Sequence, residues 1–516
     1  MDQLKKDSLL TTTIIVSLIA ILGKLLGFAR EAIIAAYYGA NALTDAFFFA
    51  QGMPAMIFPA LCSSLSTAFI SLYVSKTFQE GKTEGDRFAS RALIASLTIA
   101  ILLSCTALII LPIIVPVFAP GFKGATLSLA IYLSRLVMGS FVLIMAHYFL
   151  TAALNSKKFF YGSQIAGLMC NVFIITVTAF LGKGQGIDIL TLTVAGGHFV
   201  QVIVLIVFCR NRISFTLAAN PFHKDVKAMF TLALPILLGN SVIQLQNIVD
   251  KALASRLMEG AISGLSYSNT LNYLVITIFI TSLSTVVYPT LAENASSGDM
   301  QFFGKNLTQS ISLLIISLFP VSIITMVCAN DIVSIVFERG NFDRSATELT
   351  ATALFFYAIM YVFIAIREVL IRGFFALKDT KTPMINGSIA VGLNIIISIL
   401  LVKYMGIAGI AVGTSISSII SASLLLFSVL RRIPEVSIKK MIPLIKKIVL
   451  SGGLTALVLV LISKELKNLI PILRFMITTI LGFGVYISLL LLLKCSEIIV
   501  LVSSFKSKIK ALKIIK

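Results

Sequence analysis

Long apolar runs, separated by short polar stretches, recur from one end of the chain to the other. A helix that crosses a bilayer needs about 20 predominantly apolar residues. Fourteen segments meet this requirement, and no long polar domain interrupts them. Their ranges are 8–36, 43–75, 88–118, 126–153, 159–181, 187–209, 226–255, 264–292, 306–329, 345–376, 383–402, 407–430, 442–463 and 471–493. The pattern therefore predicts an all-α polytopic membrane protein with fourteen transmembrane helices.

The composition excludes an ordinary soluble enzyme. Hydrophobic residues make up 58% of the chain, charged residues 12%, and the mean hydropathy is +1.00, whereas a soluble domain is about a quarter charged. The net charge of +20 would suit a nucleic-acid-binding protein. In a chain this apolar, however, basic residues more often lie in loops that face an anionic cytoplasmic leaflet. We therefore expect contact with membrane lipids and no nucleic-acid partner.

The placement of lysine and arginine predicts the orientation. If the N-terminus is cytoplasmic, most of the lysines and arginines between the spans fall in cytoplasmic loops, as the positive-inside rule requires. Both termini are then cytoplasmic and the number of helices is even. The first apolar stretch continues past thirty residues and contains charges, so we expect a retained helix rather than a signal peptide.

Two short matches indicate an internal repeat. Ser63–Ala68 resembles Thr281–Val286 at an offset of 218 residues, and Ala166–Asn171 resembles Ala390–Asn394 at an offset of 223 when the asparagines are aligned. Helices 1–6 then pair with helices 7–12 about a pseudo-twofold axis along the membrane normal, with a central cavity between the lobes. The expected parts are an N-terminal lobe at 1–220, a C-terminal lobe at 221–432, and helices 13–14 with a basic cytoplasmic tail at 433–516. Chance similarity between apolar segments is the alternative.

The sequence contains no pattern for catalysis or for a cysteine–histidine metal site. The six cysteines are scattered without a CxxC pair, and no two of the three histidines have a metal-binding spacing, so packing roles are the simpler interpretation. No nucleophile–base pair or nucleotide-binding loop is present. A membrane enzyme that acts on lipid-linked sugars would need catalytic carboxylates or histidines at a membrane face. We therefore expect no enzymatic activity and no cofactor.

Ionisable residues within the spans are the first functional candidates, because each costs at least about 2.5–3.5 kcal/mol to place at bilayer depth. The first span contains Lys24, Arg30 and Glu31, and Asp45 opens the second. Lys24 and Arg30 are offset by about 120° on a helix, so both could border one cavity, with Asp45 neutralising one of them. Such a cavity would suit an anionic substrate, since arginine grips pyrophosphate through two hydrogen bonds. The alternative is that both cations snorkel or pair locally.

Two later spans contain further ionisable residues. Asp250 would hold a proton or bind a cation unless a cation on another helix pairs with it. In the span at 345–376, Glu368 and Arg372 have the i, i+4 spacing of an ion pair, and Arg367 precedes them. With Glu31, these three are candidate gate residues, although simple stabilisation of the helix explains them equally well.

Several of these residues lie in motifs that resemble the MurJ (MviN) lipid II flippase family. The matching segments are Gly23-Lys24-Leu25-Leu26-Gly27-Phe28-Ala29-Arg30-Glu31, Thr44-Asp45-Ala46-Phe47-Phe48, Val249-Asp250-Lys251-Ala252-Leu253-Ala254-Ser255, Gly260-Ala261-Ile262-Ser263, Phe337-Glu338-Arg339-Gly340-Asn341-Phe342 and Asp379-Thr380-Lys381-Thr382-Pro383. Fourteen helices is also the number in that family. Any one segment is weak evidence, but the combination is specific.

The resemblance implies the fold of the multidrug/oligosaccharidyl-lipid/polysaccharide exporter (MOP) superfamily, with two six-helix lobes and a groove made with helices 13 and 14. It also implies movement of undecaprenyl-pyrophosphate-linked disaccharide-pentapeptide from the inner to the outer leaflet of the bacterial cytoplasmic (inner) membrane, by a protein that is a monomer. Lys24 and Arg30 match cavity arginines, and Asp45 matches their acidic partner. The implied sodium-site positions are Asp250, Asn394, Ser398, Ile410 and Thr414. Sodium or a proton would then be the coupling ion.

The chain departs from the family pattern at three of these places. Lysine replaces arginine at Lys24, Thr270 stands where arginine is typical, and Ser398 replaces a carboxylate present in some members. The cavity is therefore less cationic, and a lysine attracts pyrophosphate only as a point charge. The alternatives to lipid II transport are a flippase for another undecaprenyl-linked oligosaccharide and a cation-coupled multidrug antiporter. Cationic drugs would favour carboxylates, whereas Lys24 and Arg30 favour an anion.

Overall fold

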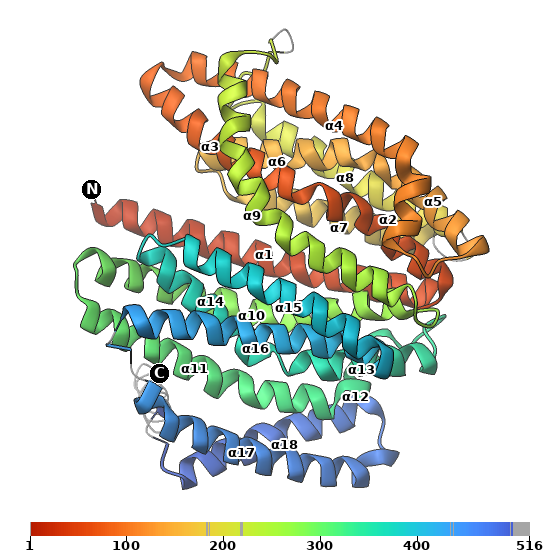
Figure 1. Cartoon of the computed structure of the whole chain (residues 1–516), viewed down its shortest axis with the longest axis vertical. Helices are drawn as coiled ribbons and strands as arrows, with labels where there is room; N and C mark the ends of the chain where they lie inside the picture. Colours follow the sequence, from red (N-terminus) through yellow and green to blue (C-terminus); the bar gives the residue numbers. More distant parts are fainter. Residues whose placement is uncertain are drawn as a thin grey trace, which may run out of the picture. The chain divides into compact units, whose positions relative to one another are not determined.

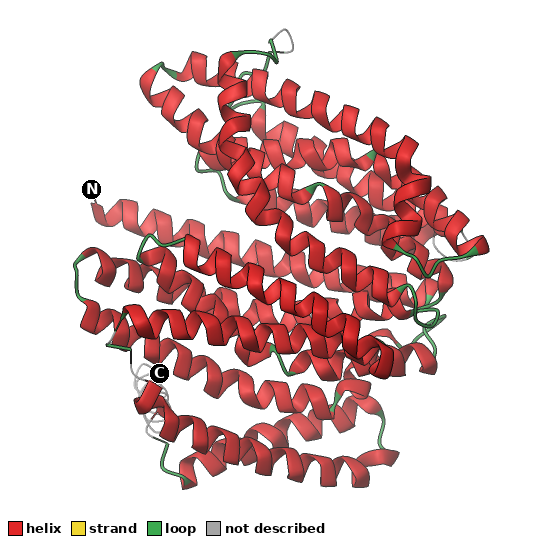
Figure 2. Cartoon of the chain, in the orientation of Figure 1, coloured by secondary structure: helices red, strands yellow, loops and turns green. Residues whose placement is uncertain are grey.

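The computed structural model describes residues 2–181, 184, 186–216, 220–433, 435–436, 438–495 and 497–498, and within them every regular element is a helix (Figure 2). In chain order the elements are α1 (Asp2–Tyr38), α2 (Ala42–Ile57), α3 (Pro59–Gln79), α4 (Lys82–Phe118), α5 (Gly124–Met138), α6 (Ser140–Ser156), α7 (Tyr161–Leu181), α8 (Ile187–Cys209), α9 (Lys224–Ala254), α10 (Ala261–Ser296), α11 (Met300–Val327), α12 (Ala329–Phe337), α13 (Arg344–Ala358), α14 (Tyr361–Ala376), α15 (Lys381–Met405), α16 (Ile407–Arg432), α17 (Ile438–Glu465), the 3₁₀ turn η1 (Leu466–Asn468) and α18 (Pro471–Leu492). The expected basic tail from residue 499 onward lies outside the described residues.

Each predicted span coincides, within a few residues, with one helix or with two consecutive helices. Apolar runs become helices because lipid offers no hydrogen bonds, so each backbone group must be satisfied within its own segment. Among the described residues, nine helices are long and apolar enough to cross a membrane, or up to eleven if each of two bent pairs forms one span. The prediction of an all-helical polytopic membrane protein is confirmed, and the number of fourteen spans stays a prediction.

Three of the predicted spans are interrupted. The first break separates α2 from α3 at Phe58, where Pro54 lies inside the last turns of α2 and Pro59 begins α3. Proline lacks the N–H that would continue the helix, but it is well suited to a first helical position. The pair α5–α6 bends by 41° and the pair α13–α14 by 48°. The short α12, which follows α11, was not predicted.

The bent pairs support the internal repeat. Each is followed by a lysine with left-handed backbone, Lys158 (φ 60°) after α6 and Lys378 (φ 59°) after α14. In both cases the N–H of the next residue bonds to the carbonyl five positions earlier, which is the Schellman ending of a helix. Two corresponding helix pairs therefore bend and end in the same way, at the interval that the sequence matches predict.

The chain divides into two compact units. The first contains the described part of Met1–Ser266 together with Arg339–Ala346, and the second contains the described part of Tyr267–Glu338 and of Thr347–Lys516. Within the first unit, α9 lies along α3 and also packs on α4 (Figure 1). The sequence placed α9 in the second lobe, and the lobe boundaries at 220 and 432 stay a prediction.

Each unit has its own apolar core. In the first, buried side chains from α6, α7 and α8 pack together; they are Ala146, Leu150, Leu154, Ala166, Val202, Leu205 and Cys209. In the second, Ile323, Ile324, Cys328 and Leu459 form a core that Phe475 and Phe483 of α18 partly cover. Arg474 of α18 also donates from Nε to both carboxylate oxygens of Asp331 in α12, at 2.8 Å each. The helices α17 and α18 are therefore held in the second unit by both apolar contacts and an ion pair.

Candidate functional site

The polar site in the first unit centres on Arg30 of α1. Its side chain is 23% exposed, and its Nη2 donates to Glu31 Oε1 at 2.6 Å. Its Nη1 donates to Asn171 Oδ1 of α7 at 3.1 Å. Lys24, one and a half turns earlier on α1, has an exposed side chain. The structure thus brings two predicted residues, Arg30 and Glu31, together with one that was not predicted, Asn171.

Asn171 also fastens α7 to the backbone of α1. Its Nδ2 donates to the carbonyl of Gly23 at 3.2 Å, and a Cβ added at Gly27 would lie 3.7 Å from the same nitrogen. The amide therefore lies against α1 at ordinary van der Waals distance from Gly27. Asn171 therefore both positions Arg30 and sets the spacing between α1 and α7.

The Arg30 site has unused hydrogen-bonding capacity. Arg30 Nε and Glu31 Oε2 are buried atoms without a hydrogen-bond partner among the described residues. A buried polar atom without a partner costs about 1–3 kcal/mol. The site therefore favours a ligand that can accept a hydrogen bond from the guanidinium, which is what a phosphate oxygen does.

The carboxylate of Asp45, at the start of α2, accepts three hydrogen bonds. Its two oxygens accept hydrogen bonds from the N–H of Gly260 and from the N–H and hydroxyl of Ser263, all at 2.7 Å. The residue is 4% exposed. A carboxylate in this position satisfies the free N–H groups at the start of α10 and complements the positive end of the helix dipole. Asp45 therefore joins the first turn of α2 to the first turn of α10.

The loop at 339–346 completes this end of the first unit. Asn341 donates from its backbone N–H to the carbonyl of Ala36 at 2.9 Å and from its side chain to the carbonyl of Tyr37 at 2.5 Å. Gly340, with φ 60°, allows the loop to approach α1 closely. Nearby in the fold, Gly121 N–H donates to the hydroxyl of Ser255 at 3.1 Å. Residues 44–48, 260–263 and 339–342, which are far apart in the sequence, thus contribute to one end of this unit.

In α14, Glu368 pairs with the adjacent Arg367, whereas the i, i+4 spacing predicted a pair with Arg372. Arg367 Nη2 donates to the adjacent Glu368 Oε1 at 3.0 Å, because an arginine side chain is long enough to reach its neighbour. Arg367 Nε and Arg372 Nε are buried atoms without a partner in the part of the chain that is described. The same adjacent arrangement occurs at Arg30 and Glu31 in α1. Their role as gates stays a prediction.

The predicted ion-site residues belong to different units. Asp250 lies in the first unit, where its Oδ1 is a buried atom without a partner in the described structure. The neighbouring Lys251 donates to the carbonyl of Phe48 at 2.7 Å. The other four positions lie on α15 and α16 of the second unit.

In the second unit, Asn394 and Ser398 are both 0% exposed. Asn394 Nδ2 donates to Thr414 Oγ1 at 3.3 Å, and that hydroxyl donates to the carbonyl of Ile410 at 3.1 Å. Asn394 Oδ1 and Ser398 Oγ have no hydrogen-bond partner among the described residues. Oxygen atoms of this kind fit a hard cation. The chemistry of α15 and α16 is therefore compatible with sodium, although this part of the site contains no carboxylate.

The sequence reasoning missed Asn171, although the signal for it was present. The repeat aligns Asn171 with Asn394, and each of these amides bonds to a polar residue of a neighbouring helix within its own unit.

The packing role expected for the cysteines agrees with the structure at five of them, which are buried, whereas Cys105 is exposed. Within the described ranges, no three His, Cys, Asp or Glu residues form a group that could hold a metal ion.

The sequence also matches a known protein family. The family model described as "Lipid II flippase MurJ" matches residues 34–481. The chain is 28% identical to the probable lipid II flippase MurJ of Treponema pallidum over 448 residues, 84% of each chain. It is 26% identical to the lipid II flippase MurJ of Burkholderia cenocepacia over 435 residues, which cover 81% of this chain and 83% of the relative.

Solved structures show the same fold. A lipid II flippase MurJ in an inward closed conformation superimposes with a TM-score of 0.78 at 25% identity, covering 92% of this chain and 98% of the other. An inward-facing multidrug resistance transporter of the MATE family, in the MOP superfamily, gives a TM-score of 0.69 at 14% identity over 80% of this chain and 95% of that one, which shows the fold alone. Since the family model covers most of the sequence, the chain belongs to the lipid II flippase MurJ family.

Proposed function

We propose that this protein moves undecaprenyl-pyrophosphate-linked peptidoglycan precursor, lipid II, from the inner to the outer leaflet by alternating access. The observation that supports this most directly is Arg30, a guanidinium held inside an apolar helix pair by Glu31 and Asn171. An ionised arginine at such a place is costly, and such residues usually mark a substrate path. The names of its relatives give the substrate class.

The proposed architecture follows the family. Fourteen spans form an N-terminal lobe at 1–220, a C-terminal lobe at 221–432 and a third part at 433–516, with both termini in the cytoplasm. The protein acts as a monomer in the bacterial inner membrane. The basic loops support the orientation, and the matching bent pairs support the two-lobe repeat.

In the proposed cycle, Lys24 and Arg30 bind the pyrophosphate. Arg30 supplies fork geometry through two hydrogen bonds, whereas Lys24 supplies a mobile point charge. Glu31 compensates Arg30 when no substrate is bound, and the phosphate takes over that role on binding. Asp45 holds α2 on α10, and Arg367, Glu368 and Arg372 act as gate residues with Glu31.

A cation couples the cycle to the membrane potential in this proposal. Asp250, Asn394, Ser398, Ile410 and Thr414 would hold sodium, or Asp250 alone a proton. One elementary charge that moves inward supplies about 2.3 kcal/mol per 100 mV. Asp250→Asn should change the response of transport to sodium and pH, measured in vesicles that contain the purified protein. An unchanged response would remove Asp250 from the coupling.

A flippase for another undecaprenyl-linked oligosaccharide is the second candidate. Lys24 and Thr270 favour it, because both replace arginines that are typical of the family and so weaken the grip on pyrophosphate. Complementation separates the two candidates. A bacterial host depleted of its own lipid II flippase should grow when this chain is supplied, and failure to grow despite good membrane expression would exclude lipid II as cargo.

Arg30→Ala should abolish growth in that assay, because it removes the guanidinium that binds the phosphate. Arg135→Ala is the matched control, since Arg135 lies on α5 with an exposed side chain. Growth of the Arg30→Ala strain at the level of the control would remove Arg30 from the mechanism.

A further inference from the structure

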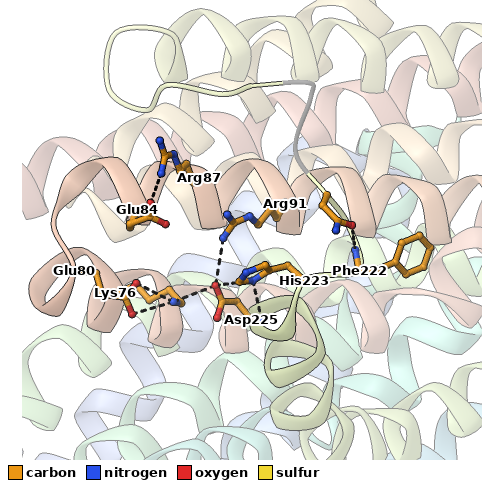
Figure 3. A network of polar contacts seen from close by, with 9 residues as sticks. Lys76, Glu80, Glu84, Arg87, Arg91, Phe222, His223 and Asp225 are labelled. Carbon is orange, nitrogen blue, oxygen red and sulfur yellow. Dashed lines mark hydrogen bonds and ion pairs between the residues drawn. The ribbon is translucent and has the colours of Figure 1, made fainter.

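A second polar network, which the proposed transport path does not use, lies where α3, α4 and α9 meet in the first unit. Three side chains converge on Asp225, the second residue of α9 (Figure 3). Its Oδ2 lies 3.1 Å from Lys76 Nζ, 3.5 Å from Arg91 Nη1 and 3.0 Å from His223 Nδ1. Because Asp225 is 9% exposed, this network fixes the start of α9 on α3 and α4.

The surface around this network carries additional positive charge. Lys224 and Lys227, in the first turn of α9, are exposed and form no ion pair with the part of the chain that the structure describes. Lys82 is exposed as well, whereas Arg87 pairs with Glu84. Two lysines on one turn therefore remain available to an external anion.

An apolar groove begins near these lysines, between α3 and α9. Its volume is about 320 Å³. It is lined by Leu61, Leu65, Phe230, Thr231, Ala233, Leu234 and Leu237. The hydroxyl of Thr231 donates to the carbonyl of Lys227 at 3.0 Å, so the polar group of the lining is already satisfied. Leu234 is 57% exposed, which leaves an apolar wall open to an apolar guest.

The lysines and the groove lie on one face of each helix. On α9, Lys227, Thr231 and Leu234 follow one another at intervals of four and three, the spacing of a single helix face. On α3, Leu65 and Lys76 are three full turns apart and also share a face. Both helices therefore present a positive end followed by an apolar wall, and the two walls meet in the groove.

The length of this face along α9 matches the thickness of one leaflet of a bilayer. From Lys227 to Leu237 the α9 axis extends about 15 Å at 1.5 Å per residue, which is half of the roughly 30 Å hydrocarbon core. Two aromatic side chains beside the network, Phe78 and Phe222, are each 91% exposed, and Figure 3 shows Phe222 pointing away from the ion pairs. Exposed apolar side chains of this size are typical of a surface that contacts another molecule or a membrane.

We propose that this groove binds an anionic phospholipid, with one acyl chain between α3 and α9 and the phosphate against Lys224 and Lys227. The apolar groove, the positive end and the one-leaflet length together favour a lipid over a protein partner. The lipid would stabilise the attachment of α9 to α3. This site is separate from Arg30, so the proposal does not depend on the identity of the transported saccharide.

The test is thermal unfolding of the full chain in a neutral detergent, followed with a thiol-reactive dye that reports exposure of the five buried cysteines. Dioleoyl phosphatidylglycerol should raise the Tm by about 2–4 °C more than dioleoyl phosphatidylcholine, because a ligand that binds the folded state stabilises it. Lys224→Gln with Lys227→Gln should abolish that difference. Lys446→Gln, which changes an exposed lysine of the second unit, should keep it.

The groove has its own variant and control. Leu234→Trp fills the groove and should abolish the phosphatidylglycerol effect, whereas Leu232→Trp changes a residue that is 48% exposed and does not line the groove, and should preserve it. Equal stabilisation by the two lipids, or by inorganic phosphate alone, would overturn the proposal. So would a full lipid effect in the double lysine variant. Complementation by the same variants tests transport independently.

Discussion

Replacing Asp45 with alanine tests the link between α2 and α10. The substitution removes one carboxylate that accepts three hydrogen bonds, from the N–H of Gly260 and from the N–H and hydroxyl of Ser263. The hydroxyl keeps a second partner, the carbonyl of Gly260 at 3.1 Å. The two backbone N–H groups lose their acceptor in a position where Asp45 itself is only 4% exposed.

The expected loss follows from those two N–H groups. Each buried donor without an acceptor costs about 1–3 kcal/mol, so the free energy of unfolding should fall by about 2–6 kcal/mol. The lost attraction between the carboxylate and the positive end of α10 adds about 0.3–2 kcal/mol. Asp45→Asn retains one carbonyl oxygen and should lose less, because it leaves one of the donors satisfied.

Thermal unfolding in detergent with the thiol-reactive dye measures this loss. The chain contains no tryptophan, so intrinsic tryptophan fluorescence is not an option, whereas the buried cysteines become reactive as the protein unfolds. Asp45→Ala should lower the Tm by several degrees. The expected order of stability is wild type, then Asp45→Asn, then Asp45→Ala.

Asp299→Ala is the matched control. Asp299 caps α11 through one exposed hydrogen bond, from the N–H of Phe302 at 3.0 Å, and loss of such a cap costs about 1 kcal/mol. Melting of Asp45→Ala at the wild-type temperature, or a loss of stability no greater than that of Asp299→Ala, would refute this role of Asp45. Either result would mean that the start of α10 finds other acceptors.

Three further predictions concern other contacts. Asn171→Ala should impair complementation without loss of membrane expression, because it frees Arg30 from α7; growth equal to wild type would contradict this role. Arg474→Ala should lower the free energy of unfolding by about 3–5 kcal/mol, because it leaves the Asp331 carboxylate buried without a cation. The double variant with Asp331→Ala should be less destabilised, and equal melting of single and double variants would count against the pair. Hydrogen bonds from backbone N–H and hydroxyl groups lower the pKa of Asp379 below its usual 3.8, so its contribution to stability is complete above that pH and is lost as the pH falls through the lower folded value. Asp379→Asn should therefore flatten the pH dependence of Tm in that acidic range, and an unchanged profile would show that other groups determine it.

The positions of the helices were predictable because they follow from a single local property. A long apolar run has few alternatives to a helix in lipid, and the break between α2 and α3 has a local cause in Pro54 and Pro59. The bend of α5–α6 also has a local cause, the glycine–serine pair at Gly139 and Ser140. The bend of α13–α14 has no comparable signal, and the short α12 lies in a segment that reads as a loop. These features depend on which neighbours pack against the segment.

The partners of the charged residues were less predictable. Arg30 was identified because an arginine in an apolar run is costly, but its bond to Asn171 depends on how α7 packs on α1. Asp45 was expected near a cation, since opposite charges attract. A helix N-terminus offers a carboxylate comparable stabilisation, and the sequence does not reveal that α10 begins beside it. Pairing across helices is a tertiary property, and residue type alone does not determine it.

The lysines with left-handed backbone after α6 and α14 affect the stability of the folded state and membrane insertion in opposite directions. Glycine at Lys158 or Lys378 would relieve backbone strain of about 1 kcal/mol. It would also remove a positive charge from a connecting loop, and such charges determine which way a nascent helix pair is inserted. A glycine variant should therefore be more stable once folded but more often inserted in the reverse orientation. The wild-type lysines thus lower the stability of the folded state and favour correct insertion.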